Sequence, residues 1–274
     1  MSFYTSLNGL KNAQVELDVI SHNIANSDTN GFKRSVTAFA DIVATSVLTD
    51  PALTTGIGAR VQAITQQFSQ GPIAQTGNSL DMTVNGEGFF VTKSPDSNTV
   101  TYTRNGSFSI DGTGFVRDNS GYRMQIFPVD ASGNVTSTAS TSMIDAQINQ
   151  LNAAGAQFSG VNVASDGKVV AAYSDGSTAT IGVVALVNFL APQTLRQLGS
   201  AHWAATGVSG SGVLGVPSTN QVGSLLSGAL EQSNVDLASE LVGLISAQRS
   251  FQANAKAIDT ATQISQTLIN LRTN

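Results

Sequence analysis

Apolar residues recur at every third or fourth position at both ends of the chain. The N-terminal pattern covers residues 2–27 and the C-terminal pattern covers roughly residues 234–272, and neither stretch contains proline. This spacing places the apolar side chains on one face of a helix. The sequence therefore predicts one long helix at each end, and at about 1.5 Å per residue the C-terminal helix is a rod of about 60 Å.

Neither predicted helix can bury its apolar face alone. Each face needs a partner helix, either in the same chain or in a neighbouring copy. We therefore expect a coiled-coil domain formed by both chain ends. This pattern favours a structural subunit of an assembly over a catalyst. The predicted assembly interface consists of Leu7, Leu10, Leu17, Ile20, Ile24, Leu237, Leu241, Leu244, Phe251, Ile258 and Leu268.

Local signals predict where these helices begin and end. The first helix should end near Asn26, because residues 27–31 are a dense run of turn formers. Gly9 is a weak point inside it and costs about 1 kcal/mol relative to a good helix former. Before the second helix, residues 233–236 fit a capping box with Ser233 or Asn234 as the N-cap.

The middle of the chain reads as β structure. It holds all six prolines, and Asn-Gly and Asp-Gly pairs separate its apolar runs. Asn105-Gly106 predicts a hairpin between residues 100–104 and 107–110, and Asp175-Gly176 predicts another. The fold class is therefore α+β. The predicted organisation is a helical domain of residues 1–33 and 228–274, a linker at 34–57, a β-rich domain of 58–129 and 161–227, and a short, polar outer excursion at 130–160.

Composition excludes several classes. Of 274 residues, 41% are hydrophobic and 11% are charged, which is typical of a globular protein. A net charge of −5 argues against nucleic-acid binding. The absence of cysteine excludes disulfides and thiolate chemistry. No apolar run is long enough to predict membrane insertion. The N-terminus lacks the pattern of a secretory signal, so we expect any export to proceed without cleavage.

The sequence offers little for catalysis. His22 and His202 are the only histidines, and no pattern of ligand spacing surrounds them. Residues 210–215 match G-x-G-x-x-G, but a dinucleotide site needs that string between a strand and a helix. Here Pro217 follows closely, so a flexible loop is the better interpretation. We therefore predict no catalytic, cofactor-binding or metal-binding residues.

The most informative motif is the segment from Asn23 to Lys33. It combines a helix stop, a turn in which Gly31 can adopt positive φ, and an aromatic residue that returns to a packed surface. The string Asn-Ile-Ala-Asn-x-x-Thr-x-Gly-Phe-Lys resembles the signature of the bacterial flagellar rod and hook family. The matching positions are Asn23, Ala25, Asn26, Thr29, Gly31, Phe32 and Lys33.

The resemblance covers nearly the whole chain. Residues 78–90 and 102–108 are similar to the first β domain of that family, and residues 228–238 and 247–256 are similar to its C-terminal helix. Within the family, hook subunits are the closer match. Segments 174–176, 203–207 and 266–272 carry that likeness. Many hook proteins insert a large outer domain near the middle, and residues 130–160 are too few for it, so a distal or proximal rod subunit is the alternative.

The resemblance implies a structural role. Many copies would pack head to tail into a helical tube lined by the terminal helices, a flexible joint that transmits torque from rod to filament. The implied partners are further copies of the chain and the rod, hook-cap and hook–filament junction proteins. The implied place is the extracellular hook and basal body of the flagellum. A secreted enzyme or adhesin with helical ends is the remote alternative.

Overall fold

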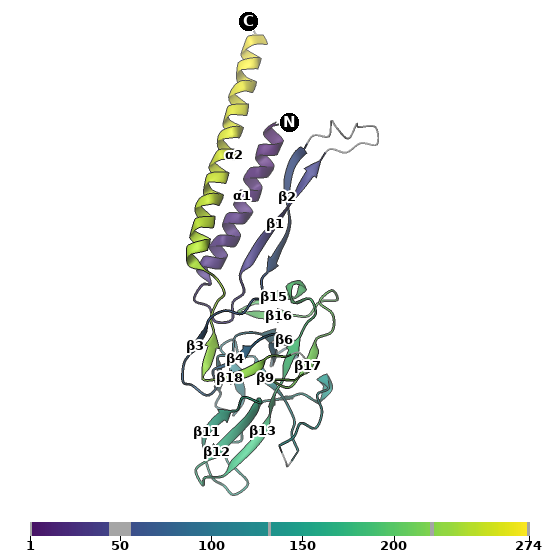
Figure 1. The fold of residues 1–274 in the computed structure, drawn as a ribbon, viewed down its shortest axis with the longest axis vertical. Helices are drawn as coiled ribbons and strands as arrows, with labels where there is room; N and C mark the ends of the chain where they lie inside the picture. The colour runs from purple at the N-terminus through teal and green to yellow at the C-terminus, as the bar shows by residue number, and fades with distance from the viewer. Residues whose placement is uncertain (1, 44–55, 131–132, 220–221, 273–274) are drawn as a thin grey trace. The chain divides into compact units, whose positions relative to one another are not determined.

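The computed structural model describes residues 2–43, 56–130, 133–219 and 222–272. The chain divides into two compact units (Figure 1). One, here called the helical unit, consists of residues 1–27, 34–67 and 235–274. The other, the β unit, consists of residues 28–33 and 68–234. The short stretch 28–33 therefore belongs to the β unit although both its neighbours along the chain belong to the helical unit.

Two long helices, α1 (Ser2–Ala25) and α2 (Leu237–Arg272), are antiparallel in the helical unit. A Cβ placed on Gly9 would lie 2.5 Å from Asn254 Oδ1, and one placed on Gly243 would lie 3.4 Å from Ile20 Cδ1. Eleven residues forward along α1 thus correspond to eleven residues back along α2. Gly9 therefore has a packing role, because it leaves room for the Asn254 side chain. Both helices were predicted, and the two helices with a β-rich middle are compatible with the α+β class.

The N-cap of α2 differs from the prediction. Asp236 Oδ1 accepts from the backbone N–H of Ala238 at 3.0 Å, and Asp236 Oδ2 accepts from Ser239 Oγ at 2.7 Å. The first of these bonds satisfies a backbone N–H that a helix start leaves open. Asp236, and not Ser233 or Asn234, is therefore the capping residue.

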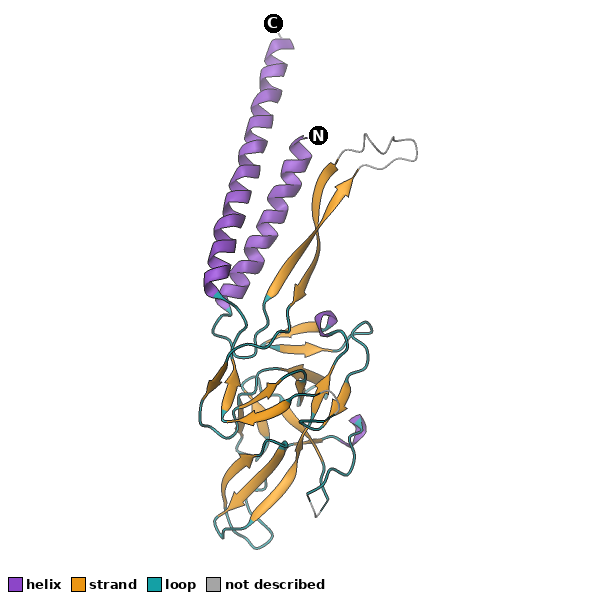
Figure 2. Ribbon diagram, viewed as in Figure 1, coloured by secondary structure: helices purple, strands orange, loops and turns teal. Residues whose placement is uncertain are grey.

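A β-hairpin accompanies α1 in the helical unit (Figure 2). Its strands, β1 (Ser35–Val43) and β2 (Gly56–Gln66), pair antiparallel. Asn12 Nδ2 on α1 donates to the Ala59 carbonyl at 2.8 Å, which fixes the hairpin along the helix. Residues 35–43 are thus a strand where the sequence predicted a linker, and the rest of that linker up to residue 55 lies outside the described residues.

The β unit is built on antiparallel strands. Its largest sheet has 13 strands along the path β11-β12-β13-β9-β5-β6-β16-β15, with β7, β8, β10, β14 and β17 beside it. Their bounds are β5 (Phe89–Lys93), β6 (Val100–Thr103), β7 (Phe108–Ile110), β8 (Val116–Asp118), β9 (Arg123–Phe127), β10 (Ile144–Asp145), β11 (Phe158–Val163), β12 (Lys168–Tyr173), β13 (Thr178–Val184), β14 (Leu186–Asn188), β15 (Arg196–Gly199), β16 (His202–Ala204) and β17 (Val213–Gly215).

The described residues of the β unit also form two small sheets and two short 3-10 helices. β3 (Ile73–Gln75) pairs with β19 (Ala229–Glu231), and β4 (Met82–Asn85) pairs with β18 (Ser224–Ser227). The 3-10 turns are η2 (Ser140–Ser142) and η3 (Pro192–Thr194). Both small sheets bring the segment just before α2 against residues 73–85, far away in sequence.

Strand β5 separates two hydrophobic clusters. Phe90 belongs to one and packs with Phe108 at 5.6 Å between ring centroids. Phe89 belongs to the other and packs with Trp203 at 5.7 Å. Successive side chains of a strand point to opposite faces, so two adjacent phenylalanines can supply both clusters.

The two hairpin predictions have different outcomes. Asp175-Gly176 joins β12 to its antiparallel partner β13, and Gly176 has φ +79°, so that hairpin is confirmed. The Asn105-Gly106 hairpin is wrong, because β6 pairs with β5 and β16 whereas β7 pairs with β8. Asn105 Oδ1 instead accepts from the Ser107 N–H at 3.1 Å, a local turn that redirects the chain.

Part of the stretch 130–160 returns to the sheet. Ala146 and Ile148 are 1% and 2% exposed and belong to the core. The Ile148 N–H donates to the Gly114 carbonyl at 2.7 Å, and the Ala146 N–H donates to the Met124 carbonyl at 2.8 Å. The alternation of buried and exposed positions from 146 to 149 is that of a strand. Few apolar residues form this alternation, so the sequence pattern predicts an exposed segment.

Candidate functional site: a buried charge cluster

The motif that ends α1 continues into the interior of the β unit. Gly31 has φ +69°, and its N–H donates to the Glu231 carbonyl at 2.8 Å. A Cβ at this position would lie 2.5 Å from the backbone nitrogen of Asn105. Both the positive φ and the close backbone approach require glycine. Directly after this turn, Phe32 and Lys33 are 4% and 0% exposed.

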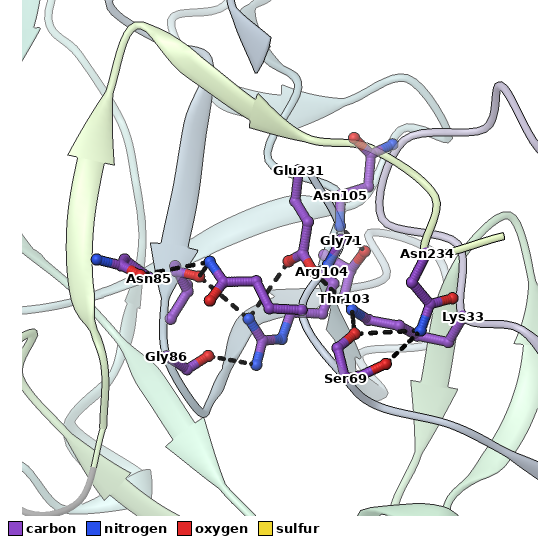
Figure 3. A network of polar contacts seen from close by, with 12 residues as sticks. Lys33, Ser69, Gly71, Asn85, Gly86, Thr103, Arg104, Asn105, Glu231 and Asn234 are labelled. Carbon is purple, nitrogen blue, oxygen red and sulfur yellow. Dashed lines mark hydrogen bonds and ion pairs between the residues drawn. The ribbon is translucent and has the colours of Figure 1, made fainter. Parts of the chain in front are cut away.

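Lys33 and Arg104 share one buried carboxylate (Figure 3). Lys33 Nζ lies 2.6 Å from Glu231 Oε1, and Arg104 Nη1 lies 3.3 Å from Glu231 Oε2. The Lys33 and Glu231 side chains are 0% exposed, and the Arg104 side chain is 4% exposed. The Gly71 N–H adds a bond to Glu231 Oε1 at 2.9 Å. We call Lys33, Arg104 and Glu231 the charge cluster.

Backbone carbonyls accept further hydrogen bonds from the two cations. Arg104 Nη2 donates to the Gly86 carbonyl at 2.7 Å, and Arg104 Nη1 donates to the Val84 carbonyl at 3.2 Å. Lys33 Nζ donates to the Ser69 carbonyl at 2.8 Å. Buried charges are tolerated when such bonds replace water. The cluster thus joins five backbone segments, at residues 33, 69–71, 84–86, 104 and 231.

Burial shapes the electrostatics of the cluster. Desolvation lowers the pKa of Lys33, and the nearby Glu231 carboxylate opposes this shift through its charge and its hydrogen bond. Arg104 adds to the lowering of the Lys33 pKa through charge repulsion. Desolvation likewise lowers the pKa of Arg104, and the Glu231 carboxylate again opposes this shift. A charge cluster that is closed to solvent cannot meet a substrate, so its role is to hold segments together.

The helical unit has its own polar contact, centred on Asn23. This side chain is 1% exposed; its Nδ2 donates to the Ser35 carbonyl at 2.8 Å, and its Oδ1 accepts from the Ser35 N–H at 2.9 Å. Nδ2 also lies 3.3 Å from Glu240 Oε2. Glu240 in turn pairs with Arg34 at 3.5 Å. Asn23 therefore links the end of α1 to β1 and to the first turn of α2.

The other motif residues shape the turn between these two polar centres. Ala25 is the last residue of α1. Asn26 continues the turn, because its N–H donates to the Asn23 carbonyl at 3.1 Å and its Nδ2 donates to the His22 carbonyl at 2.9 Å. The Thr29 carbonyl accepts from the Phe32 N–H at 3.2 Å.

Three partners of the motif carry no direct signal in the sequence. Arg104, Glu231 and Glu240 were not predicted as site residues. Arg104 and Glu231 do lie in the segments 102–108 and 228–238 that carry the family resemblance. The sequence does show a charged residue directly after apolar strand residues, which indicates a buried charge. The partner of such a charge is set only by the fold.

The structure divides the predicted assembly interface into covered and uncovered positions. Ile20 is buried at 8% exposure. Leu237, Leu241 and Leu268 are 46%, 51% and 62% exposed. The remaining predicted positions are half-buried, namely Leu7, Leu10, Leu17, Ile24, Leu244, Phe251 and Ile258. Contact between α1 and α2 therefore covers one face and leaves apolar side chains of α2 in solvent.

The residues weighed for catalysis have other surroundings. His202 Nε2 lies 2.6 Å from Asp118 Oδ2, and its ring stacks on Tyr122 at 4.5 Å. Gly212 leaves room for Val187 and Phe189, since a Cβ there would lie 2.3 Å from Val187 Cγ2. Within the described ranges, no group of three or more His, Cys, Asp or Glu residues could hold a metal ion. No helix in the same ranges is long and apolar enough to cross a membrane.

The fold and its closed charge cluster define a structural protein, with helical ends and a β-rich middle. Three family profiles match the chain. "Flagella basal body rod protein" matches residues 3–33, "Flagellar hook protein FlgE/F/G D1 domain" matches residues 83–171, and "Flagellar basal body rod FlgEFG protein C-terminal" matches residues 226–271. Each matched segment contributes one member of the charge cluster.

Full-length relatives lead to the same family. The chain is 34% identical over 283 residues to the flagellar basal-body rod protein FlgG of Buchnera aphidicola subsp. Acyrthosiphon pisum, covering 98% of this chain and 99% of that protein. It is 33% identical over 282 residues to FlgG of Bacillus subtilis, covering 99% of this chain and 98% of that protein. It is 28% identical over 412 residues to the flagellar hook protein FlgE of Salmonella typhimurium, covering 99% and 100%. The chain belongs to the flagellar rod and hook family of axial proteins, which are structural subunits and not enzymes.

Proposed function

We propose that this chain is a subunit of the flagellar hook. The observation that carries the proposal is the number of identical positions. An identity of 28% over 412 positions is about 115 identities with the Salmonella hook protein, whereas 34% over 283 positions is about 96 identities with the Buchnera rod protein. Outside the segment that this chain lacks, the likeness to the hook protein is therefore the denser of the two.

The proposed mechanism is mechanical. Many copies pack head to tail into a helical tube, with the terminal helices as a coiled-coil inner layer and the β units outside. Exposed apolar residues of α2, among them Leu237 and Leu241, support such packing, because they gain burial only when another copy covers them. Contacts between different surfaces of successive copies generate an open helical assembly. The tube bends while it transmits torque from rod to filament.

A rod subunit is the second candidate, and chain length favours it. The rod alignment covers 98% of this chain and 99% of the relative within 283 positions. The hook alignment needs 412 positions although this chain has 274 residues. A hook subunit of this size would lack a long segment that the Salmonella protein has, and would present a smaller outer surface.

Deleting the gene from its host distinguishes the two candidates. Electron micrographs of purified basal bodies should show complete rods without hooks if the chain is a hook subunit. Basal bodies whose rods are themselves missing or shortened would establish the rod candidate instead. Return of the gene on a plasmid is the control, since it should restore hooks and motility.

The proposed partners and place follow from the hook assignment. Further copies of the chain, the rod, the hook cap and the hook–filament junction proteins are the proposed neighbours, and the subunit is exported to the cell exterior without N-terminal cleavage. Mass spectrometry of the subunit in sheared extracellular appendages tests this route. Recovery of the N-terminal peptide that contains Phe3 supports it, and a mature protein that begins further downstream contradicts it.

A further inference from the structure

Among the exposed apolar side chains of α2, two pairs lie at opposite ends of the helix. Leu237 and Leu241, here called the N-terminal pair, are 46% and 51% exposed. Ile264 and Leu268, here called the C-terminal pair, are 57% and 62% exposed. In both pairs the members are four residues apart, so each forms a compact apolar patch on one side of the helix.

The spacing between the pairs fixes their directions. Ile264 follows Leu237, and Leu268 follows Leu241, by the same 27 residues. At about 3.6 residues per turn and about 1.5 Å per residue, this distance is about seven and a half turns and about 40 Å. The half turn means that the C-terminal pair points to the opposite side of the helix from the N-terminal pair.

The antiparallel register explains why the C-terminal pair is uncovered. Gly9 faces Asn254, so Ser2, the first residue of α1, comes opposite Ala261. Ala261 is half-buried, and Leu268 lies two turns further along the same side of α2. The face that packs on α1 thus continues beyond the point at which α1 begins. A second helix in line with α1 would extend this contact.

Patches at opposite ends and on opposite sides of a helix suit one kind of contact. When a second copy is shifted along the helix axis by the separation of the patches, the C-terminal pair of one copy meets the N-terminal pair of the next. Such a contact joins different surfaces, so it repeats without closing. A two-fold dimer would instead bring each patch against itself.

We propose that α2 helices of successive copies pack side by side, parallel and staggered by about 40 Å, with the C-terminal pair of one copy on the N-terminal pair of the next. This inference rests on the proposed polymerisation and names the surfaces that carry it. The occupant of both patches is a second copy of this chain.

The chain has no cysteine, so engineered thiols are the only ones present. The full-length variants Leu241→Cys and Leu268→Cys are mixed, assembled and treated with a short bis-maleimide cross-linker. We expect a cross-linked dimer of one copy of each variant at least fivefold more abundant than either self-linked dimer. The pair Leu237→Cys and Ile264→Cys should give the same result and serves as the second test if the first pair hinders assembly.

Gln266→Cys is the matched control. Gln266 is exposed at nearly the height of Leu268 but about 200° around the helix from it. Mixed with Leu241→Cys, it should give at least fivefold less cross-linked dimer than Leu268→Cys gives. Equal yields from both pairings, or a dominant dimer of two Leu241→Cys copies, would overturn the staggered contact.

The outcome separates this inference from the proposed function. Wild-type protein that forms no polymer under any assembly condition contradicts the proposed function. A normal polymer without the 241–268 link leaves polymerisation intact and removes only the staggered contact. In cryo-electron micrographs of the polymer, neighbouring α2 helices in contact should be offset by about 40 Å along their axes.

Discussion

Lys33 and Glu231 are 198 residues apart in the sequence, yet Lys33 Nζ and Glu231 Oε1 lie 2.6 Å apart with both side chains fully buried. The pair connects the end of the N-terminal motif to the strand that precedes α2. Arg104 shares the carboxylate, so one anion serves two cations. The three residues come from the three segments by which the family is recognised. This contact explains physically why a short motif near one chain end matters to the β unit.

Loss of the shared carboxylate should destabilise the fold more than loss of one cation. Glu231→Gln leaves Lys33 and Arg104 buried without a counter-charge and should lower the free energy of unfolding by about 3–5 kcal/mol. Lys33→Met leaves a neutral Arg104–Glu231 pair and should cost less. Urea unfolding followed by the fluorescence of Trp203, the only tryptophan, measures both.

The double variant decides whether the two residues act as a unit. Because Lys33→Met removes one of the two stranded cations, its addition to Glu231→Gln should cost less than the sum of the single losses. Strictly additive losses would show that the ion pair contributes no coupling.

Gly31 should tolerate no side chain. Gly31→Ala introduces a Cβ 2.5 Å from the Asn105 nitrogen in a backbone with φ +69°. Backbone strain and overpacking together should cost about 3 kcal/mol or more. Gly121→Ala is the matched control, since Gly121 has φ +84° with open space around it. Thermal unfolding should show the smaller loss for Gly121→Ala, and similar losses for both variants would rule out the close contact at Gly31.

The charge cluster should make stability rise toward alkaline pH. The pKa of Lys33 is lowered in the folded state by desolvation, so between that value and the ordinary lysine value the unfolded chain binds more protons. The contribution of Lys33 to stability is therefore complete above the ordinary lysine value and is lost as pH falls through the folded one. Urea unfolding at several pH values from about 8 to about 10 should show a steeper rise for wild type than for Lys33→Met. If the stability of wild type and of Lys33→Met changed with pH in parallel, a lowered pKa of Lys33 in the folded state would be excluded.

The cap of α2 should give a pH dependence of the same sign, but in the acidic range. Hydrogen bonds from Ser239 and from the Ala238 N–H lower the pKa of Asp236. Its stabilisation is present above the ordinary aspartate value of about 3.9 and is lost as pH falls through the lower folded value. Circular dichroism of helical content during thermal unfolding should show this loss in wild type. Asp236→Asn keeps the acceptor without the charge, so its profile in this acid range should be flatter.

Leu241 should matter to assembly and little to the folding of one copy. Leu241 is 51% exposed, so Leu241→Asp should change the stability of the monomer by less than about 1 kcal/mol while it prevents polymerisation. Leu17→Asp, at a half-buried position of α1, should prevent polymerisation and also destabilise the helical unit. Sedimentation and electron microscopy measure the polymer, and fibres of normal length from Leu241→Asp would contradict the proposed seam.

The sequence by itself determined the two terminal helices, because an apolar stripe of period 3.6 over many residues has few other solutions. It also determined the Asp175-Gly176 hairpin and the family, through the motif from Asn23 to Lys33. These features depend on local geometry or on a contiguous string. The same local rule failed at Asn105-Gly106, where the flanking strands found partners elsewhere in the sheet.

Only the tertiary structure decided which residues meet. Nothing local to Lys33 identifies Glu231 or Arg104 as its partners, because a buried charge finds its counter-charge through the topology and not through the spacing. The return of Ala146 and Ile148 to the core was hidden for the same reason, because two buried positions in a polar stretch are fixed by the sheet that receives them. The antiparallel register of α1 and α2 likewise decided which apolar residues of α2 a single copy covers and which it leaves exposed.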